Sequence, residues 1–458
     1  GAINANRIFE RGPDWVRTGE SAMGAIGLMA AAKHMYASGQ PIAVYDGVLS
    51  RFFGIWALAR QQPCVTNSSQ ADYGGACQRI YYDVEGGRTG QDDVTTTATG
   101  QMLSAMWKYH EYLLATSRRA EADQWLRDSW AVANRAGRYI LTMHDPAEHL
   151  VRGNSKGGHL WVSDAAMAVA GLRCLEQWAA LLGDPSGAEF KSVADDVVQG
   201  IETLKDYSDR KNFFRFRDMG VGGHPPSYGD CIDQLCFLPY EADVIDPGDA
   251  FCRSVSDWRT SGSEGIWMTY PADGPADWRY FGARLRFYFD AHEDNERLSP
   301  GAGLQLAKVE WKHARRTGDA VTLERARRRL EWVFDKDYSG LWFGSTGASE
   351  AEVPNGIVDW RNWTDESVRA EGWNRFCDTS AYFIEAVLML DASVDTSYVP
   401  EGFLRAERRQ ETVRISWQGS GMLQEAGDVG GPWQDITEAR SPVDVQPSAV
   451  ARYYRLKP

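Results

Sequence analysis

Residues 162–182 read VSDAAMAVAGLRCLEQWAALL, and this stretch decides the fold class. It is rich in Ala and Gly, and small side chains let neighbouring helices pack closely. Asp164 is the last residue of a Gly-bearing segment, RGNSKGGHLWVSD, and precedes a run of apolar residues. A loop, then a polar or acidic residue, then apolar residues is the pattern that begins a helix. The stretch therefore predicts a buried helix with an acid in its first turn.

The same pattern recurs along the chain at intervals of about 70 residues, which indicates a structural repeat. Between the small-residue helices lie longer-chained, more charged ones with a single apolar stripe, at 42–61, 120–141, 189–206 and 320–337. The two classes predict an inner and an outer layer of helices. The six inner starts lie near Glu20, Asp92, Asp164, Asp230, Ser299 and Asn374.

Six such units predict a mainly α fold, a closed (α/α)6 toroid of helical hairpins over residues 1–397. The short outer segment at 249–258 and the missing outer helix after the sixth unit leave alternatives open. These are a ring of seven hairpins, an irregular α-rich enzyme and an open solenoid. From 398 to 458 polar and apolar residues alternate between Gly and Pro turns, which predicts a small antiparallel β module.

The composition of the chain narrows the classes of partner that the protein could bind. The chain has 458 residues and a formal net charge of −14, which argues against a protein that binds nucleic-acid phosphates or anionic lipid. No apolar run reaches the length needed to cross a bilayer, so we expect no membrane partner. We also expect a monomer. The seven cysteines show no zinc-site spacing, so we predict no metal and no cofactor. Aromatic residues make up 12% of the chain, and flat amphipathic rings suit sugar binding.

The inner-helix starts supply candidate catalytic groups. In a ring of hairpins all these starts open on one face, and helix N-termini stabilise nearby carboxylates. Each acid could equally be an N-cap. Glycoside hydrolysis needs two carboxyl groups, one protonated and one ionised. The preferred catalytic pair is Asp164 with Asp93 or Asp92, and Asp230 is the substitute.

Gly-rich loops before these starts carry aromatic residues and predict a sugar-binding face. They hold His159 and Trp161, then His224 and Tyr228, and then three tryptophans before the sixth start. The predicted substrate-binding residues are Glu20, His159, Trp161, His224, Tyr228, Tyr280, Trp360, Trp363, Trp373 and Asp378.

These features predict a glycoside hydrolase acting on a polysaccharide or oligosaccharide. One alternative is a polysaccharide lyase that uses a Tyr or His base on a uronate. Its candidate groups are His224, Tyr228, Asn154, His159, Arg279, Tyr280, Arg284 and Arg286. A second alternative is a glycan-binding toroid without catalytic activity.

Three segments resemble the six-hairpin glycosidase superfamily of (α/α) toroids: SAMGAIGLMAAAKHM, VSDAAMAVAGL and YGDCIDQLCFLPYEAD. VSDAAMAVA also partly matches the signature of a cellulase and chitosanase family, which has an Asp at the position of Asp164. Ala166 stands where that signature has a second acid. The resemblance implies the toroid fold over about residues 15–395, and it does not define a substrate.

The tail resembles a short β module found at the C-termini of secreted proteins of environmental bacteria. The matching residues are Gly421–Ala426, Gly431–Trp433 and Tyr454–Leu456. The resemblance implies export. Cys64 and Cys77 bracket a polar stretch that a disulfide would stabilise, although two separate buried thiols would give the same pattern. We therefore expect a secreted or periplasmic protein.

Overall fold

The chain divides into two compact units, Gly1–Val394 and Asp395–Pro458. The computed structural model describes residues 14–54, 70, 72–82, 88–91, 93–207, 213–220, 225–230, 237–260, 283–285, 297–334, 360–362, 372–373, 377–390, 405–409, 412–416, 422–427, 432–437, 443–446 and 452–457.

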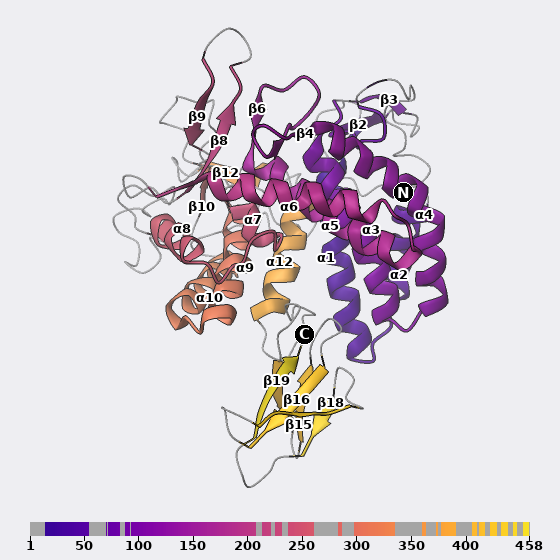
Figure 1. Ribbon diagram of the computed structural model, residues 1–458, viewed down its shortest axis with the longest axis vertical. Helices are drawn as coiled ribbons and strands as arrows, with labels where there is room; N and C mark the ends of the chain where they lie inside the picture. Colours follow the sequence, from indigo (N-terminus) through magenta and orange to yellow (C-terminus); the bar gives the residue numbers. More distant parts are fainter. Residues whose placement is uncertain are drawn as a thin grey trace. The chain divides into compact units, whose positions relative to one another are not determined.

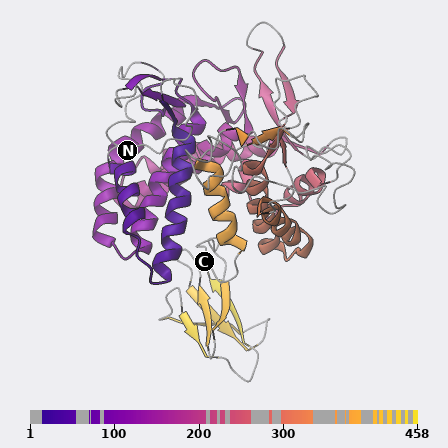
Figure 2. The same ribbon diagram turned by 180° about the vertical axis from the view of Figure 1, so that it is seen from behind.

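Six helices of the described part of the first unit form a closed ring (Figure 1). Each packs against the next in chain order, and the last packs against the first. Seen from behind, the first helix in indigo and the last in orange lie side by side (Figure 2). The ring consists of α1 (Thr18–Ala37), α3 (Thr96–Ala115), α5 (Val162–Leu182), α7 (Leu238–Glu241), α9 (Pro300–Thr317) and α12 (Cys377–Leu390).

A second set of helices pairs with members of this ring. Helix α2 packs on α1, α4 on α3, α6 on α5, and both α8 and α10 pack on α9. The predicted alternation of small-residue inner helices and charged outer helices is thus present. The bounds of the second set are α2 (Ala43–Arg51), α4 (Arg119–Met143), α6 (Gly187–Thr203), α8 (Ala250–Thr260) and α10 (Ala320–Phe334).

Glycines permit the inner helices to approach closely. A Cβ added at Gly100 of α3 would lie 2.1 Å from the carbonyl oxygen of Met167 on α5. A Cβ added at Gly27 of α1 would lie 2.5 Å from the Cβ of Ala381 on α12. Real side chains do not tolerate such distances, so the ring needs glycine at both contacts.

The contact of Gly100 with α5 leads to a prediction about stability. Gly100→Ala should lower the free energy of unfolding by about 1–3 kcal/mol, because α3 and α5 must move apart. Gly47→Ala in α2 is the matched control. The added methyl there meets nothing within 4 Å, so the variant should gain about 0.5–1 kcal/mol. Urea unfolding of both variants tests this, and equal effects would contradict the packing argument.

The fourth unit departs from the sequence prediction. We expected an inner helix to begin at Asp230, but Asp230 ends strand β9 (Ser227–Asp230), and the helix described there is α7, only four residues long. The segment FRFRD, in which aromatic and charged residues alternate, instead favours an extended strand, β8 (Phe213–Asp218), that pairs with β9.

Short antiparallel sheets precede the starts of the inner helices, so they gather at the same face of the ring. One sheet lies before α1 and α3, a two-stranded sheet lies before α5, a third sheet lies before α5 and α7, and a fourth lies before α9 and α12. Their strands are β1 (Asp14–Arg17), β2 (Arg79–Tyr82) and β3 (Arg88–Gln91); β4 (His144–Asp145) and β5 (Leu150–Val151); β6 (His159–Leu160), β7 (Lys205–Asp206), β8 (Phe213–Asp218) and β9; and β10 (Ala283–Leu285), β11 (Arg297–Ser299), β12 (Trp360–Asn362) and β13 (Gly372–Trp373).

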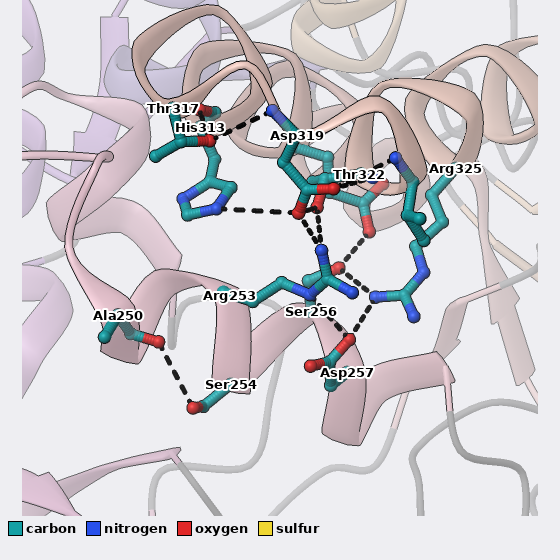
Figure 3. A network of polar contacts seen from close by, with 12 residues as sticks. Ala250, Arg253, Ser254, Ser256, Asp257, His313, Thr317, Asp319, Thr322 and Arg325 are labelled. Carbon is teal, nitrogen blue, oxygen red and sulfur yellow. Dashed lines mark hydrogen bonds and ion pairs between the residues drawn. The ribbon is translucent and has the colours of Figure 1, made fainter.

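Polar contacts join α8, α9 and α10 (Figure 3). Asp319 caps α10 by accepting hydrogen bonds from the backbone N–H groups of Val321 and Thr322, at 3.0 and 3.3 Å. The same carboxylate forms an ion pair with Arg253 of α8. Arg325 of α10 donates to Asp257 of α8 at 2.6 Å. The charged outer helices are therefore tied together by side chains as well as by packing.

Helix α5 is long and apolar enough to cross a membrane by length and composition, so the expectation that no apolar run is long enough was wrong. It is nevertheless a core helix of the ring, since 56% of its apolar window is buried inside the structure. It packs against α3, α6 and α7.

Cys77 is disulfide-bonded. The predicted partner, Cys64, lies outside the described residues. Cys174 and Cys252 are free thiols.

The second unit contains two three-stranded antiparallel sheets, as the alternation in this region predicted. Ile415 of one sheet and Leu423 of the other form its small apolar core. The first sheet has β14 (Arg405–Arg409), β15 (Thr412–Ser416) and β18 (Val443–Val445), and the second has β17 (Gln434–Asp435), β16 (Met422–Ala426) and β19 (Tyr453–Lys457).

Candidate active site

Asp164 is a buried acid in the first turn of α5, where the sequence places it. It is not the N-cap, because that position belongs to Trp161. The residue is 8% exposed, and Thr97 of α3 donates a hydrogen bond to Oδ1. Burial raises the pKa of the Asp164 carboxyl to about 6, although the hydrogen bonds from Thr97 oppose the rise. Asp164 can therefore hold a proton close to neutral pH.

A backbone segment covers the carboxyl group. Gly153 lies so close that an added Cβ would stand 2.6 Å from Oδ2 of Asp164. Gly153 is held by the first turn of α3, since its carbonyl accepts a hydrogen bond from the N–H of Thr96 at 2.8 Å. The Thr96 hydroxyl also donates to the carbonyl of Arg152 at 2.5 Å. Glycine at 153 thus allows the chain to shield Asp164 from water.

Aromatic rings stand one turn away from Asp164. Trp161 and Phe216 of β8 are stacked, with ring centroids 4.3 Å apart and planes 26° apart. His159 approaches both rings edge-on, at 5.7 Å from Trp161 and 5.4 Å from Phe216. Trp161 is only partly buried, so this cluster can present an aromatic face to a sugar ring.

A second carboxyl group belongs to the same cluster. Asp218 is paired with His159 across the β6–β8 ladder, and residues paired in this way point to the same face. Oδ1 of Asp218 lies 3.7 Å from Nδ1 of His159. That nitrogen is buried without a hydrogen-bond partner, while the side chain as a whole is 35% exposed.

Tyr228 does not join this cluster, contrary to the expectation of one shared aromatic site. It pairs with Arg217, so its ring lies on the face of the sheet opposite to Phe216 and Asp218. The guanidinium carbons of Arg215 and Arg217 lie 4.6 and 4.7 Å from the centre of its ring. Tyr228 is 49% exposed, and the two arginines make its surroundings basic.

Asp93 also differs from the prediction. It stands three residues before α3 and not in its first turn, where Thr95 is the N-cap and accepts a hydrogen bond from the N–H of Ala98. Its side chain is 53% exposed and pairs with Lys156 at 2.6 Å.

The other predicted residues are only partly described. Glu20 is in the first turn of α1, and Asp378 is the second residue of α12. Trp360 and Trp373 lie directly opposite each other in the β12–β13 ladder, in strands where we expected loops. Asp92, His224, Arg279, Tyr280, Arg286 and Trp363 lie outside the described residues.

The structure adds four residues that sequence reasoning missed: Thr97, Gly153, Phe216 and Asp218. Thr97 lies in the run VTTTAT, whose threonines look alike in the sequence. The alternation of FFRFRD could have placed Phe216 and Asp218 on one face of a strand. Within the described ranges no group of His, Cys, Asp and Glu side chains is arranged to hold a metal ion.

The buried state of Asp164 predicts a pH-dependent stability. The native pKa is about 6 against an ordinary 3.8, so the native protein binds this proton more tightly than the unfolded chain. The stabilisation that this proton gives the native state is complete below pH 4 and is lost as the pH rises through 6. The loss lowers the free energy of unfolding by about 3 kcal/mol. Asp164→Asn lacks the ionisation, so the unfolding free energy of the variant relative to the parent should rise by that amount between pH 4 and pH 7. A constant difference would contradict the buried acid.

Similar structures confirm the predicted fold. A D-mannose isomerase superimposes with a TM-score of 0.53 over 86% of this chain and 92% of its own, at 10% identity. A cellobiose 2-epimerase from Bacillus thermoamylovorans gives 0.52 over 84% and 92%, at 9% identity. A conserved protein of uncharacterised function from Thermus thermophilus gives 0.50 over 83% and 94%, at 12% identity.

The chain thus has the (α/α)6 toroid fold that these structures share, with a small β unit added at the C-terminal end. No protein-family model matches the sequence, and no curated protein is similar to it in sequence. At such low identities the superpositions establish the fold, and the chemistry has to be argued from the site.

Proposed function

We propose that the protein is a carbohydrate-active enzyme that hydrolyses glycosidic bonds, with Asp164 as the general acid. The observation that carries the proposal is the burial of the Asp164 carboxyl between Thr97 and Gly153, which raises its pKa to about 6. Glycoside hydrolysis requires a carboxylic acid that keeps its proton until the leaving oxygen takes it. Among the described carboxyl groups with a shifted pKa, Asp164 alone is shifted upward.

The second carboxyl group in this proposal is Asp218. It shares a face of β8 with Phe216, which stacks on Trp161. A sugar ring placed on that aromatic face would lie between the first turn of α5 and the end of β8. Asp218 is then available as the ionised base or nucleophile. The partners predicted from the sequence, Asp93 or Asp92 with Asp230 as the substitute, are the alternatives for this role.

A second candidate is a sugar isomerase or epimerase. It is favoured by His159, whose Nδ1 is buried without a hydrogen bond beside the Asp218 carboxylate. An imidazole in contact with a carboxylate can take a proton from carbon, which isomerisation requires. Two similar structures are an epimerase and an isomerase of sugars by name.

One set of incubations separates these functions. The protein is incubated with β-glucan, mannan, xylan, pectin, alginate and their disaccharides. Hydrolysis releases reducing ends, a lyase also produces an unsaturated uronate that absorbs in the ultraviolet, and an isomerase converts a disaccharide without cleaving it. We expect reducing ends alone. Conversion without cleavage would favour the second candidate, and a lack of reaction with every glycan would oppose both.

Secretion is part of the same proposal. The disulfide at Cys77 and the C-terminal β unit support it, because disulfides persist in oxidising compartments. Detection of the protein in the culture medium of an expressing bacterium tests it, and retention of the protein in the reducing cytoplasm would contradict it.

A further inference from the structure

The hairpin of residues 144–153 is fastened to two parts of the ring. On α6, Asp196 accepts hydrogen bonds from both histidines of the hairpin, His144 at Nε2 and His149 at Nδ1, each at 2.7 Å. The hairpin also packs tightly on that helix, since a Cβ added at Gly200 would stand 1.9 Å from the carbonyl oxygen of His149. These contacts are the first attachment of the hairpin, on the side that faces α6.

Its second attachment is an ion pair with β8. The carboxylate of Glu148 accepts two hydrogen bonds from the guanidinium of Arg217, at 3.1 and 3.2 Å. The side chains are 22% and 18% exposed, so the pair is largely shielded from water. A bidentate pair of this kind fixes orientation as well as distance.

The Glu148–Arg217 pair links two parts of the candidate active site. One part is the Asp164 carboxyl with its backbone cover, and the other is the aromatic cluster with Asp218. The hairpin ends at Gly153, which covers the carboxyl group of Asp164. Strand β8 places Arg217 between Phe216 and Asp218, which point to its other face. Neither Glu148 nor Arg217 touches Asp164 in the structure.

We propose that Glu148 and Arg217 are positioning residues, and that their ion pair fixes the cover over Asp164 relative to the aromatic cluster and Asp218. The pair acts through the backbone at both ends, by holding the hairpin on one side and strand β8 on the other. Loss of the pair would let the hairpin move away from α5 and admit water to Asp164.

Other titratable groups surround this carboxyl. Burial raises the pKa of the Tyr139 phenol on α4, and the nearby charges of Asp164 and Asp93 raise it further. The Asp93–Lys156 pair and Arg152, itself 3.4 Å from Asp145, belong to the segments that flank Gly153. All of these groups keep their charges in the variants below, so each single variant changes only the charge of Glu148 or of Arg217 directly.

The test uses two substitutions whose direct electrostatic effects are opposite. Removal of a negative charge in Glu148→Gln lowers the pKa of Asp164, and removal of a positive charge in Arg217→Met raises it. Admission of water lowers the pKa in both variants. We expect both to lower it by about one unit, a tenfold change in proton affinity. The pKa is obtained from the pH dependence of unfolding, with and without Asp164→Asn in each background.

A charge swap, Glu148→Arg with Arg217→Glu, keeps the pair and should restore the pKa. Glu189→Gln is the control, since its pair with Arg138 is exposed and includes no residue of the hairpin. Opposite shifts in the two single variants, or no shift in folded protein, would overturn the proposal.

The effect on catalysis rests on the proposed function, whereas the pKa measurement does not. If the protein is a hydrolase, the single variants should lower kcat about tenfold or more with less change in KM. A lowered pKa without glycosidase activity in the parent protein would keep the positioning pair and reject the proposed function.

Discussion

Asp164→Asn is expected to lower kcat/KM for glycoside hydrolysis by about 10²–10⁴-fold, the usual contribution of a general acid. An amide has nearly the shape of the carboxyl group but cannot give a proton to the leaving oxygen. The fold should persist, because Thr97 and Gly153 can still pack against the side chain. In the parent protein the rate should fall as the pH rises through about 6, where Asp164 loses its proton. The measurement is release of reducing ends against pH.

Asp195→Asn is the matched control for this prediction. Asp195 is an exposed carboxylate on α6, paired with Lys191 and Arg173, and its loss should leave the rate unchanged. Asp218→Asn and Asp93→Asn, assayed alongside, identify the second carboxyl group. A substrate whose leaving group needs no proton should recover much of the lost rate in Asp164→Asn. Full activity of that variant on ordinary glycosides would remove Asp164 from the mechanism.

The ring of inner helices could be predicted from the sequence because packing makes it periodic. Helices that pack tightly need small residues at their contacts, and those residues recur about every 70 positions. The fourth unit could not be predicted in the same way. Residues 228–244 contain enough apolar side chains for a helix, but Asp230 belongs to a strand because β9 completes a ladder with β8. Strand pairing depends on contacts between segments, which a local pattern does not contain.

The candidate site was predictable only where one residue carries its own signal. Asp164 stands out because an acid in the first turn of an apolar helix needs an explanation. Its pKa depends on Thr97, 67 positions earlier, and on Gly153, which covers it. The sequence also grouped Tyr228 with Trp161, since both precede inner-helix starts. The alternation of β8 separates them to opposite faces of one sheet, a consequence of register that only the structure reveals.

Substitution of a buried charge should have the largest effect on stability. Glu310 of α9 and Arg329 of α10 form an ion pair with both side chains fully buried, at 2.6 Å from Nε to Oε2 and 2.8 Å from Nη2 to Oε1. Ser256 of α8 donates to the same carboxylate at 2.6 Å. Glu310→Gln removes the carboxylate charge that the Arg329 guanidinium contacts in this dry site, so the free energy of unfolding should fall by about 3–5 kcal/mol.

Two further variants decide whether charge is the cause of that loss. Glu310→Leu combined with Arg329→Met removes both charges and should recover most of the stability, because the desolvation cost of the pair disappears as well. Glu189→Gln breaks the exposed pair with Arg138 and should cost no more than about 1 kcal/mol. Urea unfolding of the three variants measures these differences. If the double variant were as unstable as Glu310→Gln, the packing of α8, α9 and α10 would depend on the shape of these side chains and not on the balance of their charges.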